Sequence, residues 1–254
     1  MAGKILGRTG LRLSAFGPSL GTSSDAPRMS SFDQPPNWCD IPVDVAVAEW
    51  AQLVGLLEGQ WSLALSAWAQ TADEGEASSA MGGEPAEGRS APLAPPAVAP
   101  EEEIHRPDFF LCVRVGPAHW NQSMSIMVDQ VLWRTGQPHI DLLQLAPFDL
   151  ERIKAGEPFR RLEELRDSRR VRFFGIAVDN LRDARQAVEQ TPAHAITVHA
   201  SYQEPGWPEL FDAANQFDTG LIAGPAVANN NPETARRLLM DTPITAFAWP
   251  ADIG

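Results

Sequence analysis

The chain has 254 residues, 44% of them hydrophobic, which is enough to bury one sizeable core, and we expect a single domain over residues 1–254. Its formal charge of −13 argues against nucleic acid as a partner, because phosphate backbones are bound by clustered Lys and Arg. No stretch approaches the roughly 18 apolar residues of a membrane span, and the N-terminus has no apolar signal segment, so we expect a cytoplasmic protein without membrane contact.

The first part of the chain predicts a strand, a loop, a helix and a second strand. Residues 13–16 form an apolar run after a short hairpin and suit a first core strand. Residues 22–43 are rich in Ser, Pro and Asp and are expected to form a long irregular loop. Hydrophobic residues at helical spacing predict a helix over 44–59, and "WSLALSAWA" at 61–69 predicts the second strand.

An acidic insertion follows this second strand. Residues 71–104 contain eight acids and one base, and the stretch "EPAEGRSAPLAPPAVAP" within them holds five prolines. Proline removes a backbone donor and excludes both a regular helix and a central strand. The composition predicts a flexible insertion, for which a plain linker is favoured over a docking segment.

Strand and helix patterns then alternate to the end of the chain. The predicted strands are 109–115, 139–145, 171–178, 195–202, 220–227 and 244–249. The predicted helices are 123–134, 157–168, 181–190, 208–217 and 232–240. Together with the two earlier strands this makes eight, and eight alternating units predict an α/β fold, the closed (β/α)₈ TIM barrel. Barrels of this kind place their active sites at the carboxyl ends of the strands.

Four segments resemble the aldo-keto reductase family in their residue pattern and in their order along the chain: "LGRTGLRLSAFGPSLGT", "HIDLLQLAPFD", "LEELRDSRRVRFFGIAVDN" and "LFDAANQFDTGLIAG". The resemblance covers the chain apart from residues 22–43 and 71–104. It implies a (β/α)₈ barrel that reduces carbonyls with NADPH, in which a tyrosine donates a proton while a lysine, an aspartate and a histidine tune it.

Two of the four positions that the resemblance assigns to this chemistry hold residues of the wrong kind. Ala146 stands where the family has its histidine, and a methyl group can neither donate nor orient a proton. Arg114 stands where the family has its lysine, and a guanidinium keeps the charge but does not exchange its proton.

The other two positions belong at the end of the second strand and in the loop beyond it. With the second strand at 61–69, the aspartate position falls on Ala64 or Leu65 and the tyrosine position on Ala69 or Gln70. None of these side chains ionises. The only tyrosine, Tyr202, lies on a different strand, so the resemblance predicts that no catalytic residue of the family is kept.

The cofactor positions implied by the resemblance are also altered. Ala177 and Val178 stand where the family has a Ser-Asn pair, and His199 stands where it has a glutamine. Tyr202 matches the tyrosine that stacks on the nicotinamide. No cofactor is expected, and weak NADPH binding at Tyr202 and His199 is the alternative.

A small group of polar residues is predicted to lie near the barrel mouth: Arg114, Gln144, Asp149, Asp179, His199 and Tyr202. For Arg114 and Asp149 a structural salt bridge is favoured over a ligand-binding ion pair. His199 is interpreted as a hydrogen-bonded core residue rather than a general base. The five histidines and two cysteines show no metal-ligand spacing, so no metal is predicted.

Two functions from different classes remain open at this point. The first hypothesis is a catalytically inactive barrel that acts as a binding or structural subunit of a protein complex, with contacts from the inserted loops and from Trp38, Trp120 and Trp207. The alternative is an NADPH-dependent oxidoreductase, or another enzyme, that holds its ligand against Tyr202 with Arg114 as electrophile. A small-molecule sensor that uses the emptied cavity is a third reading.

Overall fold

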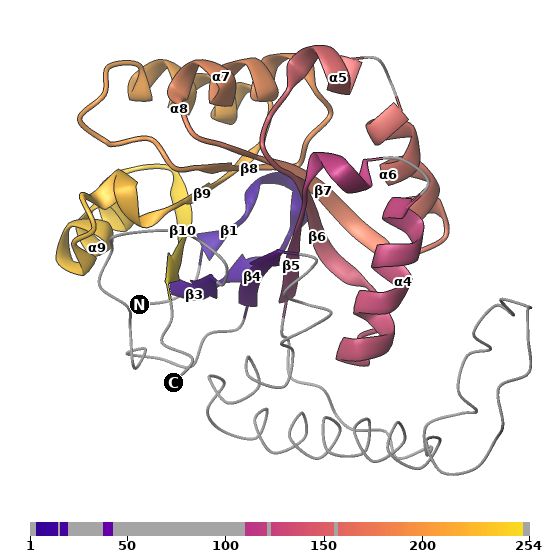
Figure 1. Ribbon diagram of the computed structural model, residues 1–254. Helices are drawn as coiled ribbons and strands as arrows, with labels where there is room; N and C mark the ends of the chain where they lie inside the picture. The colour runs from indigo at the N-terminus through magenta and orange to yellow at the C-terminus, as the bar shows by residue number, and fades with distance from the viewer. Residues whose placement is uncertain are drawn as a thin grey trace, which may run out of the picture.

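The computed structural model describes residues 4–14, 16–19, 38–42, 110–120, 123–154 and 157–250 of the chain. Eight parallel strands close into a barrel in the order β10-β3-β4-β5-β6-β7-β8-β9 (Figure 1). They are β3 (Phe16–Ser19), β4 (Trp38–Pro42), β5 (Phe110–Val115), β6 (Ile140–Leu145), β7 (Val171–Val178), β8 (Ala195–Val198), β9 (Gly220–Ala223) and β10 (Ile244–Pro250). The predicted (β/α)₈ barrel is confirmed.

Helices connect the strands from β5 onward and lie outside the barrel (Figure 1). They are α4 (Ser123–Thr135), α5 (Leu150–Lys154), α6 (Glu157–Asp167), α7 (Leu181–Gln190), α8 (Trp207–Gln216) and α9 (Pro232–Asp241), with short 3₁₀ turns η1 (Gly7–Thr9), η2 (Pro117–His119) and η3 (Pro225–Ala228). The predicted helices in this part of the chain agree with these bounds to within one residue at each end, apart from α5, which was not predicted. None of the helices in the described ranges is both long and apolar enough to pass through a membrane.

The amino ends of the strands are covered by a hairpin made of β1 (Lys4–Ile5) and β2 (Arg12–Leu13), which pair in antiparallel fashion. Leu6 and Leu11 from its loop join the apolar cluster inside the barrel. Leu6 packs so closely on the start of β9 that a Cβ at Gly220 would lie 2.4 Å from its side chain. The hairpin fills one end of the barrel, so the carboxyl ends of the strands form the other, where a site is expected.

Alternation along the strands separates two apolar clusters. Leu111, Val113 and Val115 of β5 pack with residues of the surrounding helices, whereas Cys112 belongs to the cluster inside the barrel. Side chains of successive strand residues point to opposite faces, which explains why these segments read as nearly continuous apolar runs. The same alternation directs Arg114 of β5 into the barrel.

The first two predicted strands need correction. β3 begins at Phe16, where the predicted strand over 13–16 ended, and the second barrel strand is β4, inside the predicted loop 22–43. β4 pairs directly with β5, with Trp38 opposite Phe110, so 61–69 is not the second strand of the barrel. A five-residue strand that contains an aspartate and ends in proline resembles a loop in sequence.

Three other predictions fall on residues that the structure does not describe: the helix over 44–59, the segment 61–69 itself and the acidic insertion 71–104. Two predicted strands are shorter than expected. The predicted strands 195–202 and 220–227 end as strands at Val198 and Ala223, because loop residues that lead into the next helix follow.

Candidate functional site

An ion pair lies inside the barrel between two neighbouring strands. β4 places Asp40 inward, and β5 places Arg114 inward two residues beyond the residue opposite it. The Nε atom of Arg114 lies 3.0 Å from Oδ2 and 3.1 Å from Oδ1 of Asp40. The side chain of Asp40 is only 1% exposed and that of Arg114 14%. A buried carboxylate is stable only when it is paired and hydrogen-bonded, and this pair meets that condition.

Two further strands contribute hydrogen bonds to the pair, and a third strand extends the network. Ser19 Oγ on β3 donates to Asp40 Oδ2 at 3.1 Å, and Gln144 Nε2 on β6 donates to Asp40 Oδ1 at 3.5 Å. Thr197 Oγ1 on β8 donates in turn to Gln144 Oε1 at 2.6 Å. The network therefore joins β3, β4, β5, β6 and β8 across the barrel interior, and its buried polar groups satisfy one another.

A largely buried histidine lies close to this network. His199 follows β8, and its ring lies against Gly224, where an added Cβ would be 2.2 Å from Nδ1. Burial lowers the pKa of His199 below its ordinary value, while the carboxylate of Asp40 acts against this shift and Arg114 adds to it. The imidazole is therefore neutral at pH 7, and it has one ring nitrogen that can accept a proton.

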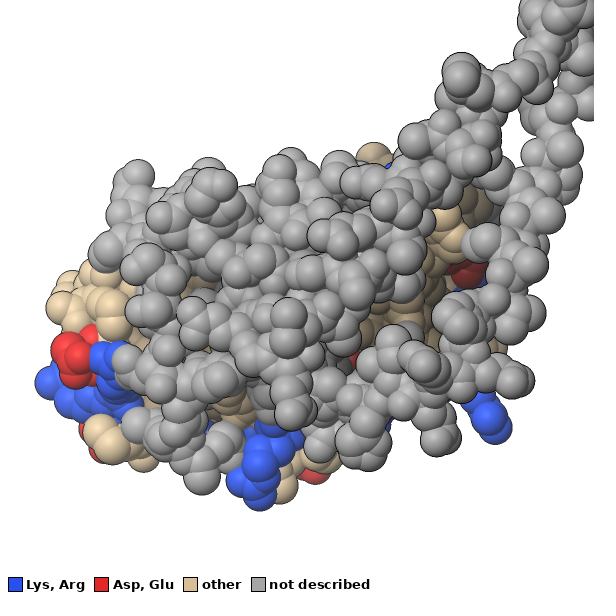
Figure 2. Space-filling view, turned by 90° about the horizontal axis from the view of Figure 1, so that it is seen from below, with Lys and Arg blue, Asp and Glu red and all other residues tan. Residues whose placement is uncertain are grey.

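Figure 2 views the molecule from below and shows part of its described charged side chains. At the left of this view Lys and Arg lie together with Asp and Glu. Within the described ranges no group of three His, Cys, Asp or Glu side chains is arranged to hold a metal ion.

Solved structures resemble this barrel over nearly its whole length. A putative aldo-keto reductase from Pseudomonas aeruginosa matches with a TM-score of 0.60 and 15% sequence identity, covering 99% of this chain and 90% of that one. The chain has the aldo-keto reductase fold. The thermostable aldo-keto reductase Tm1743, in complex with the inhibitor epalrestat, also matches with a TM-score of 0.60 and 15% identity, over 99% of this chain and 89% of that one.

The aldo-keto reductase AKR11C1 from Bacillus halodurans, in its apo form, gives a TM-score of 0.58 and 15% identity, over 100% of this chain and 87% of that one. No protein-family model and no curated protein matches the sequence. Identities this low establish the shared fold and leave the chemistry to be argued from the residues of this chain.

With β4 as the second strand of the barrel, an acidic residue that sequence reasoning did not consider joins the candidate site. β4 carries Asp40 at its centre, inside the barrel, whereas the predicted aspartate position at Ala64 or Leu65 lies outside the described residues. Sequence reasoning missed Asp40 because it placed this strand some twenty residues too late. The signal was present, since Trp38 and Asp40 alternate with apolar Cys39, as expected for a strand with one face inside the barrel.

The ends of β6 and β5 carry Ala146 and Arg114, two residues that the sequence analysis singled out. Ala146 follows the last residue of β6, and its backbone N–H donates to the carbonyl of Val115 at 3.1 Å. Its methyl group offers no proton donor at the place where the resemblance puts a histidine. Arg114 lies near the end of β5, but its partner is Asp40 rather than the predicted Asp149. Asp149 instead accepts a hydrogen bond from the backbone N–H of Arg152 at the start of α5.

Tyr202, the predicted nicotinamide stacker, makes its aromatic contacts with α8. Its ring centroid lies 5.4 Å from that of Trp207 and 6.5 Å from that of Phe211, and the residue is 36% exposed. His199 precedes it on the same loop, beside the polar network. The two predicted cofactor residues therefore share a loop, His199 lying beside the polar network and Tyr202 packing against α8.

The three tryptophans predicted to line a surface contact are buried. Trp38 is fully enclosed, and Trp120 and Trp207 are each 2% exposed. Each indole N–H donates to a backbone carbonyl, those of Ser14, Val115 and Ser201 respectively. A buried indole whose N–H is satisfied in this way serves packing, so any contact surface must use other residues.

Proposed function

We propose that this chain is a catalytically inactive protein of aldo-keto reductase fold that acts as a binding or structural subunit of a protein complex. The observation that carries the proposal is the ion pair between Asp40 and Arg114 inside the barrel. The carboxylate of Asp40 also accepts hydrogen bonds from Ser19 and Gln144, so we interpret the pair as a structural part of the barrel interior rather than as a ligand-binding group.

The chemistry of the strand tips supports this reading. Carbonyl reduction requires a group that gives a proton to the forming alkoxide, and a positioned acid contributes about 10²- to 10⁴-fold in rate. Arginine stays protonated at any working pH and is a poor donor, and Ala146 has no proton to give. Relative to the family that the sequence resembles, the hydrophobic strands are kept, whereas Ala146 and Arg114 stand in place of the histidine and the lysine. This combination is expected of a chain that needs the fold and not the proton transfer.

Location and partners are part of the same proposal. Cys39 and Cys112 are both free and buried, which suits a reducing compartment, and we place the protein in the cytoplasm. A protein partner is favoured over nucleic acid because the chain carries a formal charge of −13.

A second function is favoured by a specific observation. Asp40 lies inside the barrel on its second strand, where the sequence resemblance expects an aspartate, and the neutral imidazole of His199 lies near it. These groups support an NADPH-dependent oxidoreductase with a non-standard site, in which His199 would exchange the proton and Arg114 would polarise the carbonyl.

The deciding experiment titrates the purified protein with NADPH, followed by quenching of its tryptophan fluorescence, and then measures NADPH oxidation with a panel of aldehydes and ketones. We expect no saturable binding up to millimolar NADPH and no oxidation above the protein-free rate. Saturable micromolar binding with turnover that His199→Gln abolishes would establish the oxidoreductase instead. Glu189→Gln on the outside of α7 is the control, since Glu189 pairs there with Arg185.

A further inference from the structure

The outer face of α4 exposes two large apolar side chains. Ile126 is 60% exposed and Trp133 43%, and their spacing of seven residues puts them on the same face of the helix. The guanidinium of Arg134 lies over the Trp133 ring, 5.0 Å from its centroid. An exposed tryptophan beside an isoleucine and an arginine has the composition of a protein contact rather than of an ordinary helix surface.

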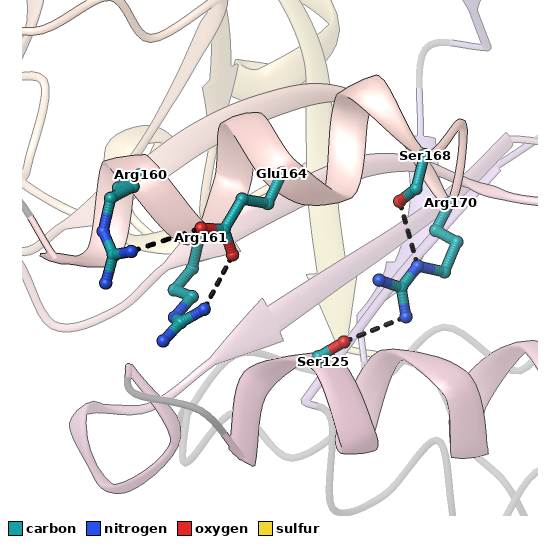
Figure 3. A network of polar contacts seen from close by, with 6 residues as sticks. All are labelled: Ser125, Arg160, Arg161, Glu164, Ser168 and Arg170. Carbon is teal, nitrogen blue, oxygen red and sulfur yellow. Dashed lines mark hydrogen bonds and ion pairs between the residues drawn. The ribbon is translucent and has the colours of Figure 1, made fainter.

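A row of arginines borders this face where α4 meets α6. Arg160 and Arg161 extend from α6 toward α4, and Arg170 reaches from the turn after α6 to Ser125 on α4 (Figure 3). The distance from Arg170 Nη1 to Ser125 Oγ is 2.9 Å, and that to Asp129 Oδ1 is 2.8 Å. Asp129 lies one helical turn from both Ile126 and Trp133, so Arg170 adjoins the apolar pair, and Arg160 and Arg161 extend the basic surface along α6.

The carboxylates that neutralise these arginines are exposed and weakly held. Glu164 accepts from Arg160 at 3.4 Å and from Arg161 at 2.7 Å, and it is 47% exposed. Asp129 is 57% exposed. Exposed ion pairs contribute only about 0–1 kcal/mol, so carboxylates from another molecule can replace or join them at little cost.

We propose that this α4–α6 surface, made of Ile126, Trp133, Arg134, Arg160, Arg161 and Arg170, docks an acidic segment of a partner protein. The partner segment supplies carboxylates to the arginines and an apolar side chain to the Ile126–Trp133 pair. Tryptophan and arginine carry most of the binding energy at protein interfaces, and complementary charge selects the partner. The inference rests on the proposed function and gives the chemistry of the partner.

The test uses the full-length protein and a labelled synthetic peptide, APLAPPAVAPEEEI, which has the sequence of residues 91–104 and combines three glutamates with apolar residues. Fluorescence anisotropy should show saturable binding that weakens as salt is raised, because exposed charges are screened. Trp133→Ala should weaken binding by about tenfold or more, as truncation of an interface anchor does. Arg160→Glu should weaken it several-fold.

Matched variants on other helices serve as controls. Arg185 on α7 is 54% exposed and pairs with Glu189 four residues on, as the 60% exposed Arg160 pairs with Glu164. Met240 on α9 is a 65% exposed apolar residue. Arg185→Glu and Met240→Ala should leave the affinity unchanged.

Absent binding, or equal weakening by Arg185→Glu, would overturn the docking surface. Higher affinity after deletion of residues 91–104 from the chain would show that its own segment is the occupant, and would also overturn the partner proposal. None of these readouts depends on NADPH. Turnover of NADPH would therefore refute the proposed function separately, whatever the peptide result.

Discussion

Asp40 is the residue that best connects sequence, packing and function in this barrel. Its carboxylate accepts hydrogen bonds from three side chains on three other strands, those of Ser19, Arg114 and Gln144. Removing a carboxylate from water costs several kcal/mol unless such partners replace the water. Asp40 is therefore stable only when these three side chains surround it, and its hydrogen bonds in turn hold their strands in place.

Asp40→Asn should destabilise the protein by about 3 kcal/mol, because it removes the buried carboxylate that faces the charge of Arg114 inside the barrel. Urea denaturation followed by circular dichroism measures the change. Asp129→Asn, which breaks the exposed pair with Arg170, should cost less than about 1 kcal/mol. A loss of similar size in both variants would mean that the buried pair contributes no more than a surface pair.

His199 gives the protein a dependence on pH. Its pKa is lowered from the ordinary value of 6.5, mainly by burial, so the unfolded chain binds a proton before the folded chain does. Stability should be full above about pH 6.5 and decrease as the pH falls from there toward the lowered pKa of the folded state.

Between about pH 7 and pH 5 the free energy of unfolding of His199→Gln should fall less than that of the wild type, measured in urea at each pH. His194 makes a second contribution of the same sign, because burial and the nearby Arg8 also lower its pKa. Part of the decrease should therefore remain in the variant. Parallel pH curves for the two proteins would rule out a contribution from His199.

At the scale of elements, the sequence predicted the later strands and not β4, for a physical reason. β6 and β7 are runs of six and eight residues dominated by apolar side chains, because both of their faces are buried. β4 has five residues and places Asp40 at its centre, so no apolar run marks it.

The candidate site was predicted in part for the same reason. Arg114, Gln144 and His199 were expected near the mouth because they stand at the ends of recognised strands. Asp40 was missed together with its strand. Ser19 and Thr197 were missed because a hydroxyl in a strand gives no sequence signal until its partner across the barrel is known.

Gly17 of β3 shows how closely the interior is packed. A Cβ at this position would lie 2.3 Å from the indole of Trp38, which is fully buried on β4. Gly17→Ala should lower the free energy of unfolding by about 1–3 kcal/mol. The added methyl group would push β3 and β4 apart, and each of them is held by backbone pairing to its other neighbour, β10 or β5. Chemical denaturation gives the value.

Gly116→Ala is the matched control, since its added Cβ would lie 3.9 Å from the carbonyl oxygen of Ala146, an ordinary van der Waals distance. It should leave the stability unchanged or raise it by up to about 1 kcal/mol. If the two alanine variants behave alike, the contact between β3 and Trp38 is looser than the packing indicates.

At the scale of the whole molecule, the barrel closes by direct pairing of β4 with β5, in register from Trp38 and Phe110 to Pro42 and Arg114. Deletion of residues 82–103, which lie between these two strands in sequence, should therefore leave folding intact. A shorter connection changes the entropy of loop closure by less than about 0.6 kcal/mol. Thermal unfolding should stay cooperative with a nearly unchanged midpoint, and loss of the transition would assign those residues a part in the fold.

The barrel is not equally closed all the way round. Among the described residues, β3 and β4 are in register at one residue pair, Ser19 with Asp40, whereas β6 and β7 are in register at five. Local opening should therefore begin between β3 and β4, and amide hydrogens there should exchange with deuterium earlier than those between β6 and β7. The hydrogen bond from Ser19 to Asp40 joins β3 to β4, so the buried carboxylate also holds these two strands of the barrel together.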